Sequence, residues 1–368
     1  MKCKICNCLK TNLIFKSDGG LPILSNVVFI NKIKAKNIAS TKMEIYHCSN
    51  CDFVFDVSKK NILFDKNYDN SQQYSQIYIN YMEQICNDIK NIPVNNNKIV
   101  EIGCGNGFLV NMLNNLGMDA YGFDTSYNGN NHKIKNRYYN EKDEDIKPGL
   151  FVLRHMLDYL ENPLEFLHQI AKINNYNSTF YIEIPSYDYI EKYNFWIDFN
   201  AERFSYFSKE FFKNIFNNFT IKETFNDQYL IVIARMNELK EVSFNNYIRR
   251  NYLMESFNNT KTFINTLNNV ALWGASGRGV TFANLIDSNQ IKIQYLIDIN
   301  KNKINKYIGG TGHKIISIDE IKNSNILNII IMNSIYESEI KKILKEKELD
   351  IKTYTIDVIL KKEINYET

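Results

Sequence analysis

The chain has 368 residues, of which 44% are hydrophobic and 13% aromatic, enough to build two or three domains with buried cores. Its 44 Lys and Arg residues against 41 Asp and Glu leave a net charge of +3, which gives no general case for nucleic-acid binding. No run of 18 apolar residues predicts a membrane span, and the first residues, "MKCKICNCLK", lack the apolar stretch of a signal peptide. We therefore expect a cytoplasmic protein with no nucleic-acid or membrane partner.

Two C-x-x-C pairs lie near the N-terminus. Cys3 and Cys6 form the first pair, and Cys48 and Cys51, in "HCSNC", form the second, with 41 residues between the pairs. In a reducing compartment, cysteines spaced in this way favour metal binding over disulfides. Two such turns complete a closed tetrahedral site, so we expect a structural zinc ion in a small domain over residues 1–60.

Other assignments of these cysteines stay open. Cys8 or His47 could replace one of the four ligands. Unliganded structural cysteines are disfavoured by the doubled spacing. A zinc-ribbon nucleic-acid binder is disfavoured by the small net charge. Four thiolates leave no open coordination position, so zinc catalysis is not expected.

A strand, a glycine turn and a helix follow the first amphipathic helix, "YSQIYINYMEQICNDI". In "NKIVEIGCGNGFLVNMLNNLG" an apolar strand runs into Gly103, Gly105 and Gly107 and then into a helix. Glycines allow the backbone to turn tightly and to approach a ligand. The next strand, "MDAYGFD", ends in Asp124, at the spacing at which an acidic residue holds a ribose diol.

The composition of this turn separates two ligand classes. A dinucleotide site reads G-x-G-x-x-G, whereas this turn reads G-x-G-x-G with Glu101 two residues ahead of it, where a carboxylate repels a pyrophosphate. The E-x-G-x-G-x-G turn resembles motif I of class I S-adenosylmethionine-dependent methyltransferases; a glycine turn in another α/β fold is the alternative. The cofactor-binding residues that we predict, with the ribose contact at Asp124 implied by the resemblance, are Glu101, Gly103, Cys104, Gly105, Gly107, Phe108, Asp124 and Arg154.

The pattern of strands and helices continues to about residue 240. "GLFVLRHMLDYLENPLEFLHQI" predicts a strand that ends at Arg154 and His155 and then a helix, and "STFYIEIPS" predicts a strand that ends near Glu183. A helix and two further strands follow, and these last two look like the hairpin that closes class I methyltransferase sheets. We expect a methyltransferase domain over residues 61–240.

A second strand, glycine turn and helix lies in "NNVALWGASGRGVTFANLI", followed by a strand that ends in Asp298. This predicts a Rossmann-like domain over residues 241–368, in which the helix N-terminus holds a phosphate and Arg278 adds a bidentate donor. The turn reads G-x-x-G-x-G, so an NAD-dependent enzyme is only a weak alternative. The substrate-binding residues that we predict are Gly274, Ser276, Arg278, Gly279 and Asn333.

The order of these three parts resembles the sugar C-methyltransferase family, which acts on nucleotide-linked keto-sugars in antibiotic and polysaccharide pathways. "GGLPILSNVVF", "NYDNSQQYS" with Tyr68, "LRHMLDYL", "IEIPS", "WGASGRG" and "IGGTGHKI" are similar to its motifs. The resemblance implies an α/β fold: a class I methyltransferase Rossmann-like sheet, preceded by a small zinc-binding domain and followed by a second Rossmann-like domain. It also implies that the middle domain holds S-adenosylmethionine and the last domain holds the sugar nucleotide.

One stretch departs from this family. Where the family carries a Tyr-His-Glu-His run, this chain reads Asn200-Ala201-Glu202-Arg203. The resemblance assigns the base of C-methylation to the second histidine, and arginine stays protonated and cannot replace it. Transfer to a hydroxyl asks for less, because positioning supplies much of the barrier reduction and His155 or Glu202 can take the proton. Arg203 is then a clamp on Glu202 or on a substrate oxyanion.

We therefore expect a methyltransferase that acts on a nucleotide-activated sugar for a surface (capsule) polysaccharide or a secondary metabolite, with O-methylation favoured. C-methylation of a keto-sugar and a catalytically silent member that binds sugar nucleotides are the alternatives. The predicted catalytic residues are Tyr68, His155, Glu202 and Arg203. The predicted cofactors are S-adenosylmethionine and a structural zinc ion.

Overall fold

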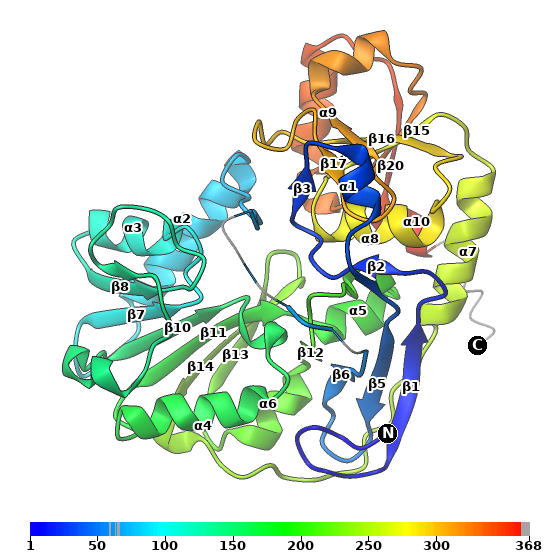
Figure 1. Ribbon diagram of the computed structural model, residues 1–368. Helices are drawn as coiled ribbons and strands as arrows, with labels where there is room; N and C mark the ends of the chain where they lie inside the picture. Colours follow the sequence, from blue (N-terminus) through cyan, green and yellow to red (C-terminus); the bar gives the residue numbers. More distant parts are fainter. Residues whose placement is uncertain (59, 63, 65–66, 362–368) are drawn as a thin grey trace.

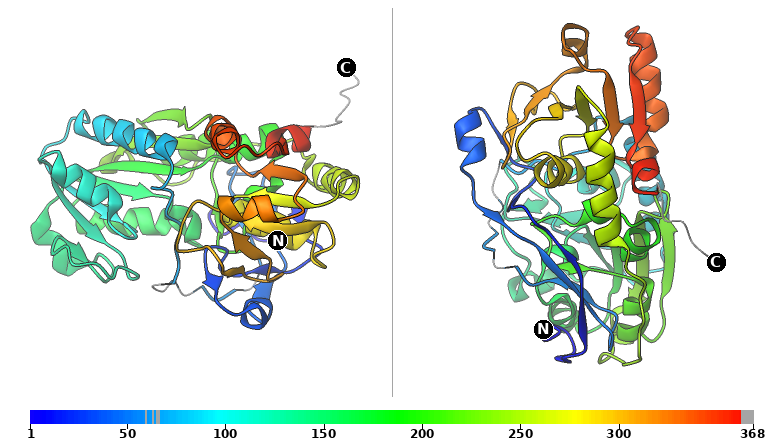
Figure 2. Two further views of the ribbon diagram at one scale, coloured as in Figure 1. Left: turned by 90° about the horizontal axis from the view of Figure 1, so that it is seen from above. Right: turned by 90° about the vertical axis from the view of Figure 1, so that its right-hand side faces the viewer.

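The computed structural model describes residues 1–58, 60–62, 64 and 67–361, and four β-sheets organise them (Figure 1). Within this described part, two of the sheets have seven strands each, one has four and one has two. Figure 2 shows that the two larger sheets lie side by side, while the N-terminal strands run along both. No helix of the described residues is long and apolar enough to cross a bilayer.

The middle sheet has the strand order β13-β14-β11-β10-β7-β8-β9. The first five strands in the chain pair in parallel, and β14 is antiparallel to both β11 and β13. This is the class I methyltransferase arrangement, closing hairpin included, so the predicted fold class is confirmed. The strands are β7 (Lys98–Ile102), β8 (Asp119–Phe123), β9 (Ile134–Lys135), β10 (Leu150–Arg154), β11 (Thr179–Pro185), β13 (Thr220–Thr224) and β14 (Tyr229–Arg235).

Helices cover both faces of this sheet because its central strands are apolar on both sides. Along β10, Leu150 and Val152 enter the core on the α2 and α3 side, whereas Phe151 and Leu153 enter the core on the α4 and α6 side. Ser75 caps the start of α2 by accepting a hydrogen bond from the Tyr78 N–H. The helices are α2 (Gln76–Lys90), α3 (Phe108–Asn115), α4 (Pro163–Ile173), α5 (Tyr187–Tyr193) and α6 (Lys209–Ile215).

The C-terminal sheet has the strand order β20-β19-β15-β16-β18-β17-β3, and its pairs from β20 to β18 are parallel. This confirms the second Rossmann-like unit. The strands are β15 (Val270–Trp273), β16 (Ile293–Ile297), β17 (Tyr307–Ile308), β18 (Lys314–Ile316), β19 (Asn328–Ile331) and β20 (Lys352–Thr355). The helices are α7 (Leu253–Asn265), α8 (Gly277–Ile286), α9 (Glu337–Glu346) and α10 (Ile356–Lys361).

The N-terminal segment forms the small sheet β2-β4 alone but shares its larger sheets with later parts of the chain. Its four-stranded sheet has the order β1-β5-β6-β12, and its strand β3 completes the C-terminal sheet at an edge (Figure 1). The elements are β1 (Thr11–Lys16), β2 (Leu21–Pro22), β3 (Val28–Phe29), α1 (Lys32–Lys36), β4 (Ser40–Thr41), β5 (Glu44–Cys48), β6 (Val54–Asp56) and β12 (Ser205–Tyr206). The boundaries near residues 60 and 240 stay predictions, and strand pairs cross both of them.

Short 3₁₀ helices place several residues that matter below. The segment before Glu202 contains α5 and η3, which pack into one core with α7 and α8. This segment thereby ties the middle of the chain to the C-terminal glycine turn. The 3₁₀ helices are η1 (Glu141–Ile146), η2 (Leu157–Tyr159), η3 (Trp196–Asp198), η4 (Met236–Glu238), η5 (Ile318–Asn323) and η6 (Ser334–Tyr336).

Candidate active site

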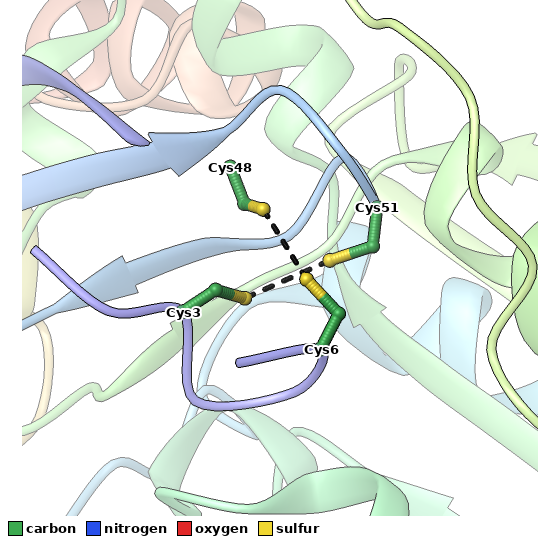
Figure 3. A group of neighbouring side chains, drawn as sticks. All are labelled: Cys3, Cys6, Cys48 and Cys51. Carbon is green, nitrogen blue, oxygen red and sulfur yellow. Dashed lines mark hydrogen bonds between the residues drawn. The ribbon is translucent and has the colours of Figure 1, made fainter. Parts of the chain in front are cut away.

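Four cysteine thiols meet near the N-terminus (Figure 3). The Sγ atoms of Cys3 and Cys51 are 3.7 Å apart, those of Cys6 and Cys48 are 3.6 Å apart, and all four lie within 4.8 Å of one another. A tetrahedron with metal–sulfur bonds of about 2.3 Å has edges of about 3.8 Å. The cluster therefore has the size and the donor chemistry of a four-thiolate zinc site, and the structure confirms the predicted grouping.

The two alternative ligands point elsewhere. Cys8 lies outside the four-thiol group, where its sulfur accepts a hydrogen bond from the Lys10 N–H at 3.3 Å. His47 is buried, and its Nε2 lies 2.8 Å from Oδ1 of Asp52. That carboxylate also pairs with Arg249, so His47 belongs to a buried ion-pair network beside the cluster.

A large cavity lies where the middle sheet faces the C-terminal sheet. Its empty volume, including the mouth, is about 1370 Å³. The chain brings together here three of its four predicted catalytic residues, His155, Glu202 and Arg203, and all five predicted substrate-binding residues. Tyr68 stands directly behind the wall. Residues that the sequence analysis had not selected also line it: Asn26, Asn70, Ser71, Gln72, Tyr159, Asp198, Asn200, Asp298 and Met332.

Glu202 is the centre of a buried hydrogen-bond cluster. Its Oε2 accepts from the Ser25 N–H at 3.0 Å, and its Oε1 accepts from Asn26 Nδ2 and from the Tyr68 hydroxyl, each at 3.1 Å. The Tyr68 oxygen also lies 3.1 Å from the Tyr159 hydroxyl. Burial raises the pKa of Glu202, and the hydrogen bond from Ser25 and the charge of Arg203 offset part of that increase. The carboxylate thus fixes Tyr68 and the 25–26 loop at the cavity wall.

Arg203 is paired with Asp158 rather than with its neighbour Glu202. Its Nε lies 2.9 Å from Oδ2 of Asp158, and its Nη1 donates to the Asp198 carbonyl at 3.3 Å. Of the two predicted clamping roles, the one on Glu202 is therefore not the arrangement seen. No spacing in the sequence points to Asp158 as the partner, because it lies 45 residues away along the chain.

His155 and Arg154 share one buried carboxylate. Glu183, fully buried at the end of β11, accepts from Arg154 Nε at 2.7 Å and Nη2 at 3.1 Å, and its Oε1 lies 3.0 Å from His155 Nε2. Burial acts to raise the pKa of Glu183, but Arg154 and His155 together bring it well below its usual range. His155 has a left-handed backbone with φ of 48°, and its ring lies edge-on to Tyr229 at 4.6 Å.

These contacts fix the orientation of the imidazole. The Glu183 carboxylate can only accept a hydrogen bond, so in the neutral imidazole of His155 the Nε2–H donates to it. Nδ1 is then the hydrogen-bond acceptor of the ring. Nδ1 has no hydrogen-bond partner among the residues that the structure describes, and His155 lines the cavity. The sequence analysis missed Glu183 as a site residue, although "IEIPS" placed it at a strand end beside His155.

The first glycine turn lies at the carboxyl end of β7. Gly103, Gly105 and Gly107 have φ values of 74°, 54° and 79°, and a Cβ on Gly107 would lie 2.2 Å from Cδ1 of Ile134. Only glycine fits these positions without strain. Asp124 supports the turn, since its Oδ2 accepts from the Gly105 N–H at 2.8 Å.

Glu101, Cys104 and Phe108 surround this turn. Glu101 is buried, and its Oε2 has no hydrogen-bond partner in the described part of the chain. Burial raises its pKa to about 7, against the opposing charge of Arg154. Cys104 is buried in the core beside the turn, and Phe108 begins α3. None of these residues lines the large cavity, but Asn106 Nδ2 donates to Ser71 Oγ at the cavity wall at 3.3 Å.

The second glycine turn forms the opposite wall. Gly274 has a φ of 120°, and a Cβ on Gly279 would lie 1.9 Å from the Gly274 carbonyl oxygen. Ser276 Oγ accepts from the buried Lys303 Nζ at 2.6 Å. Arg278 donates to both carboxylate oxygens of Asp198, at 2.6 and 2.9 Å.

Asn333 connects the two sheets through an amide pair. Its Oδ1 accepts from Gln228 Nε2 at 3.0 Å, and its Nδ2 donates to Gln228 Oε1 at 3.2 Å. Arg278 and Asn333 are therefore held at the cavity by partners from the middle of the chain. The sequence analysis had selected neither Asp198 nor Gln228 nor Lys303.

Three buried polar atoms at the cavity have neither a hydrogen bond nor an ion-pair partner among the described residues, whereas a fourth, Nε of Arg203, makes no hydrogen bond but faces Asp158. The three are Oδ1 of Asn26, Oδ1 of Asn200 and Nη1 of Arg278. Burying a polar atom without a hydrogen bond costs about 1–3 kcal/mol. Unpaired atoms of this kind in a cavity wall indicate hydrogen bonds that a polar ligand completes.

Comparisons with known proteins agree with this layout. Residues 74–220 match the family model of a methyltransferase domain, and residues 266–359 match a model described as C2185-like, N-terminal. A probable tRNA (uracil-O(2)-)-methyltransferase of Caenorhabditis elegans is 58% identical over 31 residues, which make up 8% of this chain and 6% of that protein. The chain therefore spans only a small fraction of the length of the curated relative that it matches.

Solved structures give distant likenesses. A SAM-dependent methyltransferase of Archaeoglobus fulgidus is 15% identical, with 42% of this chain and 94% of that chain covered and a TM-score of 0.32. The PH0226 protein of Pyrococcus horikoshii OT3 is 14% identical, with 47% of this chain and 100% of that chain covered and a TM-score of 0.34. At such TM-scores these likenesses carry no argument.

The family match, together with the first glycine turn inside it, identifies residues 74–220 as a methyltransferase domain. S-adenosylmethionine, the methyl donor that the turn motif predicts, fits a domain of this class. The matches concern methyltransferases in general, so the closer resemblance to sugar C-methyltransferases stays a prediction.

Proposed function

We propose that the protein transfers the methyl group of S-adenosylmethionine to a hydroxyl of a nucleotide-activated sugar, for a surface polysaccharide or a secondary metabolite. The observation that supports this most is the cavity with its three unpaired polar atoms, on Asn26, Asn200 and Arg278. Two carbonyl acceptors and one cationic donor suit a polyhydroxylated ligand that carries anionic oxygens.

The first glycine turn is the proposed cofactor site. Gly103, Gly105 and Gly107 keep the backbone free of side chains. Asp124 accepts three hydrogen bonds from Gly105 and Ser126, which leaves about one of its four lone-pair positions for a ribose hydroxyl. The unpaired Glu101 oxygen suits the cationic methionine end. When bound, S-adenosylmethionine supplies an electrophilic methyl group on its sulfonium. Arg154, buried against Glu183, acts in this proposal through Glu183 and His155.

His155 is the base that the geometry supports best. The acceptor oxygen bonds to the methyl carbon as the sulfur–methyl bond breaks, which leaves S-adenosylhomocysteine, and Nδ1 of His155 takes the hydroxyl proton. Glu183 holds the imidazole in the tautomer that can do so. Glu202 is already the acceptor of three protein hydrogen bonds, so we assign it to positioning Tyr68 and Asn26.

C-methylation of a keto-sugar is the second candidate, since the same imidazole lies within the cavity. Arg203 does not serve as a base in either reaction, because its guanidinium stays protonated and faces Asp158. A silent sugar-nucleotide binder would use the same cavity without turnover. The 31-residue match to a tRNA methyltransferase is too short to support an RNA substrate.

The four-cysteine cluster is assigned to a structural zinc ion. It is made by four thiolates alone, which leaves no open coordination position. A metal ion there would fix the N-terminal turn against the loop that follows β5, beside the four-stranded sheet.

Carbon-13-methyl S-adenosylmethionine with a panel of nucleotide-linked hexoses and heptoses, keto and non-keto, tests the proposal. We expect a methoxy signal in the NMR spectrum of one product. A carbon-attached methyl that appears only with keto-sugars would replace O-methylation by C-methylation. Binding of a sugar nucleotide without turnover, while S-adenosylmethionine also binds, would support the silent member instead.

A further inference from the structure

The two glycine turns of this protein are built around the same internal hydrogen bond. In the middle domain, Asp124 Oδ2 accepts from the Gly105 N–H at 2.8 Å, and its Oδ1 accepts from the Ser126 N–H at 2.7 Å. In the C-terminal domain, Asp298 Oδ2 accepts from the Ala275 N–H at 3.0 Å, and its Oδ1 accepts from the Asn300 N–H at 2.9 Å. Asp298 therefore stands where Asp124 stands.

Asp298 has acceptor capacity left and faces the cavity. A carboxylate offers about four lone-pair positions, and the two backbone N–H groups occupy two of them. Its nearest cation, Lys303 Nζ, is 3.9 Å away and is already bonded to Ser276 Oγ and to the Ala275 carbonyl. The carboxylate lines the large cavity, with the side chain 12% exposed.

The surroundings of Asp298 suit a nucleoside diphosphate. The first turn of α8 lies along the same wall, and a helix N-terminus attracts phosphate. Trp273 and Ile299, beside the turn and beside Asp298, give the wall an apolar part. A carboxylate about 20 residues after the glycine turn of a Rossmann-like unit accepts hydrogen bonds from a vicinal diol, the 2′- and 3′-hydroxyls of ribose.

We infer that Asp298 binds the ribose diol of the substrate's nucleotide, so that the enzyme takes sugars carried on ribonucleoside diphosphates in preference to their 2′-deoxy counterparts. This inference rests on the proposed function and narrows its substrate class. A 2′-deoxyribose offers one hydroxyl donor fewer to a buried anionic acceptor. The carboxylate is then left partly unsatisfied, which a binding site penalises strongly.

The test is calorimetric titration of the full-length protein with matched pairs: UDP and 2′-deoxy-UDP, GDP and 2′-deoxy-GDP, CDP and 2′-deoxy-CDP, and ADP and 2′-deoxy-ADP. For the base that binds, we expect the ribo form to bind at least about tenfold more tightly than the deoxy form. In Asp298→Asn that ratio should fall close to one. The substitution keeps the shape and one acceptor for the Ala275 N–H.

A matched control comes from the other domain. Asp124→Asn should weaken S-adenosylhomocysteine binding and leave the ribo-to-deoxy ratio unchanged. Asp298→Asn should bind S-adenosylhomocysteine as the unaltered protein does, which also shows that it is folded. Should Asp298→Asn fail this check, Asp298→Glu, which keeps the charge, is the second variant and should retain a ribo preference.

Equal binding of ribo and deoxy forms to the unaltered protein would overturn this inference and leave the proposed function standing. A ribo preference that survives in Asp298→Asn would overturn it as well. Failure of every diphosphate to bind, with S-adenosylhomocysteine still bound, would overturn both the inference and the proposed substrate class.

Discussion

Arg278 and Asp198 form a two-point ion pair at the cavity, with Nε to Oδ1 at 2.6 Å and Nη2 to Oδ2 at 2.9 Å. Asp198 lies in η3, four residues before Glu202, and Arg278 lies in the first turn of α8. The pair therefore fixes the glycine turn of the C-terminal domain relative to the Glu202 cluster. Arg278 also keeps Nη1 without a partner among the described residues, so this side chain has a donor left for the proposed substrate.

Arg278→Gln should destabilise the protein by about 3 kcal/mol, because removing one member of a mostly buried pair leaves the other charge uncompensated. Urea unfolding measures this loss. Arg278→Gln combined with Asp198→Asn should cost less than the sum of the two single changes, since the unpaired charge is then gone. Additive losses would mean that the two residues do not stabilise each other.

Glu183→Gln should lower kcat by at least about 100-fold while KM for S-adenosylmethionine changes little, because the imidazole of His155 loses the negative charge that orients it and stabilises its protonated form. His155→Asn should lower kcat to a similar extent. Steady-state kinetics with the sugar nucleotide that the enzyme methylates measures kcat and KM of both variants. The double variant should be no slower than His155→Asn, and a further large loss would show that Glu183 acts apart from His155.

Asn200→Ala should raise KM for the sugar nucleotide by about tenfold, because Oδ1 of Asn200 is a buried acceptor without a protein partner among the described residues and can accept a hydrogen bond from the ligand. KM for S-adenosylmethionine should not change. Asn70→Ala is a useful control, since Asn70 lines the same cavity but is exposed. Equal effects of the two substitutions would remove the specific role of Asn200.

The pKa of Glu101 is raised to about 7 by burial, which gives a pH dependence with a definite sign. The folded protein binds this proton more tightly than the unfolded chain, so the stabilising contribution is complete below about pH 4.5 and is lost as the pH rises through about 7. Glu101→Gln removes the charge. We therefore expect the variant to gain up to about 2–3 kcal/mol over the unaltered protein between pH 5 and pH 8.

Glu101→Gln should weaken S-adenosylmethionine binding most at pH 8, where Glu101 of the unaltered protein is ionised. Urea unfolding at both pH values and titration with S-adenosylmethionine provide the two readouts. A stability difference between variant and unaltered protein that does not depend on pH would show that Glu101 is already ionised at pH 5.

Cys48→Ser should lose bound metal, whereas Cys8→Ser should keep it, because only Cys48 belongs to the four-thiol cluster. We expect about one zinc ion per chain in the unaltered protein. Elemental analysis by mass spectrometry after gel filtration measures the content of all three proteins. Loss of zinc from Cys8→Ser, with Cys48→Ser unchanged, would contradict the assignment.

Much of the scaffold could be predicted from the sequence. The paired cysteines, the two glycine turns and the apolar strands before them are local patterns, and each one reflects a constraint that acts within a few residues. Gly107 has to be glycine because its φ is positive and Ile134 fills the space that a Cβ would take. The class I strand order could also be predicted, because the sequence shows strands, turns and helices in alternation.

Only the tertiary structure decided which partners the polar residues at the site take. Arg203 pairs with Asp158, Asn333 pairs with Gln228, and β12 joins the N-terminal sheet, all across long stretches of chain. Side-chain pairing at long range depends on how the layers pack, and no residue spacing encodes it. The sequence determined where the two glycine turns lie, whereas packing determined that the second turn faces His155 across one cavity and that Glu183 orients this imidazole.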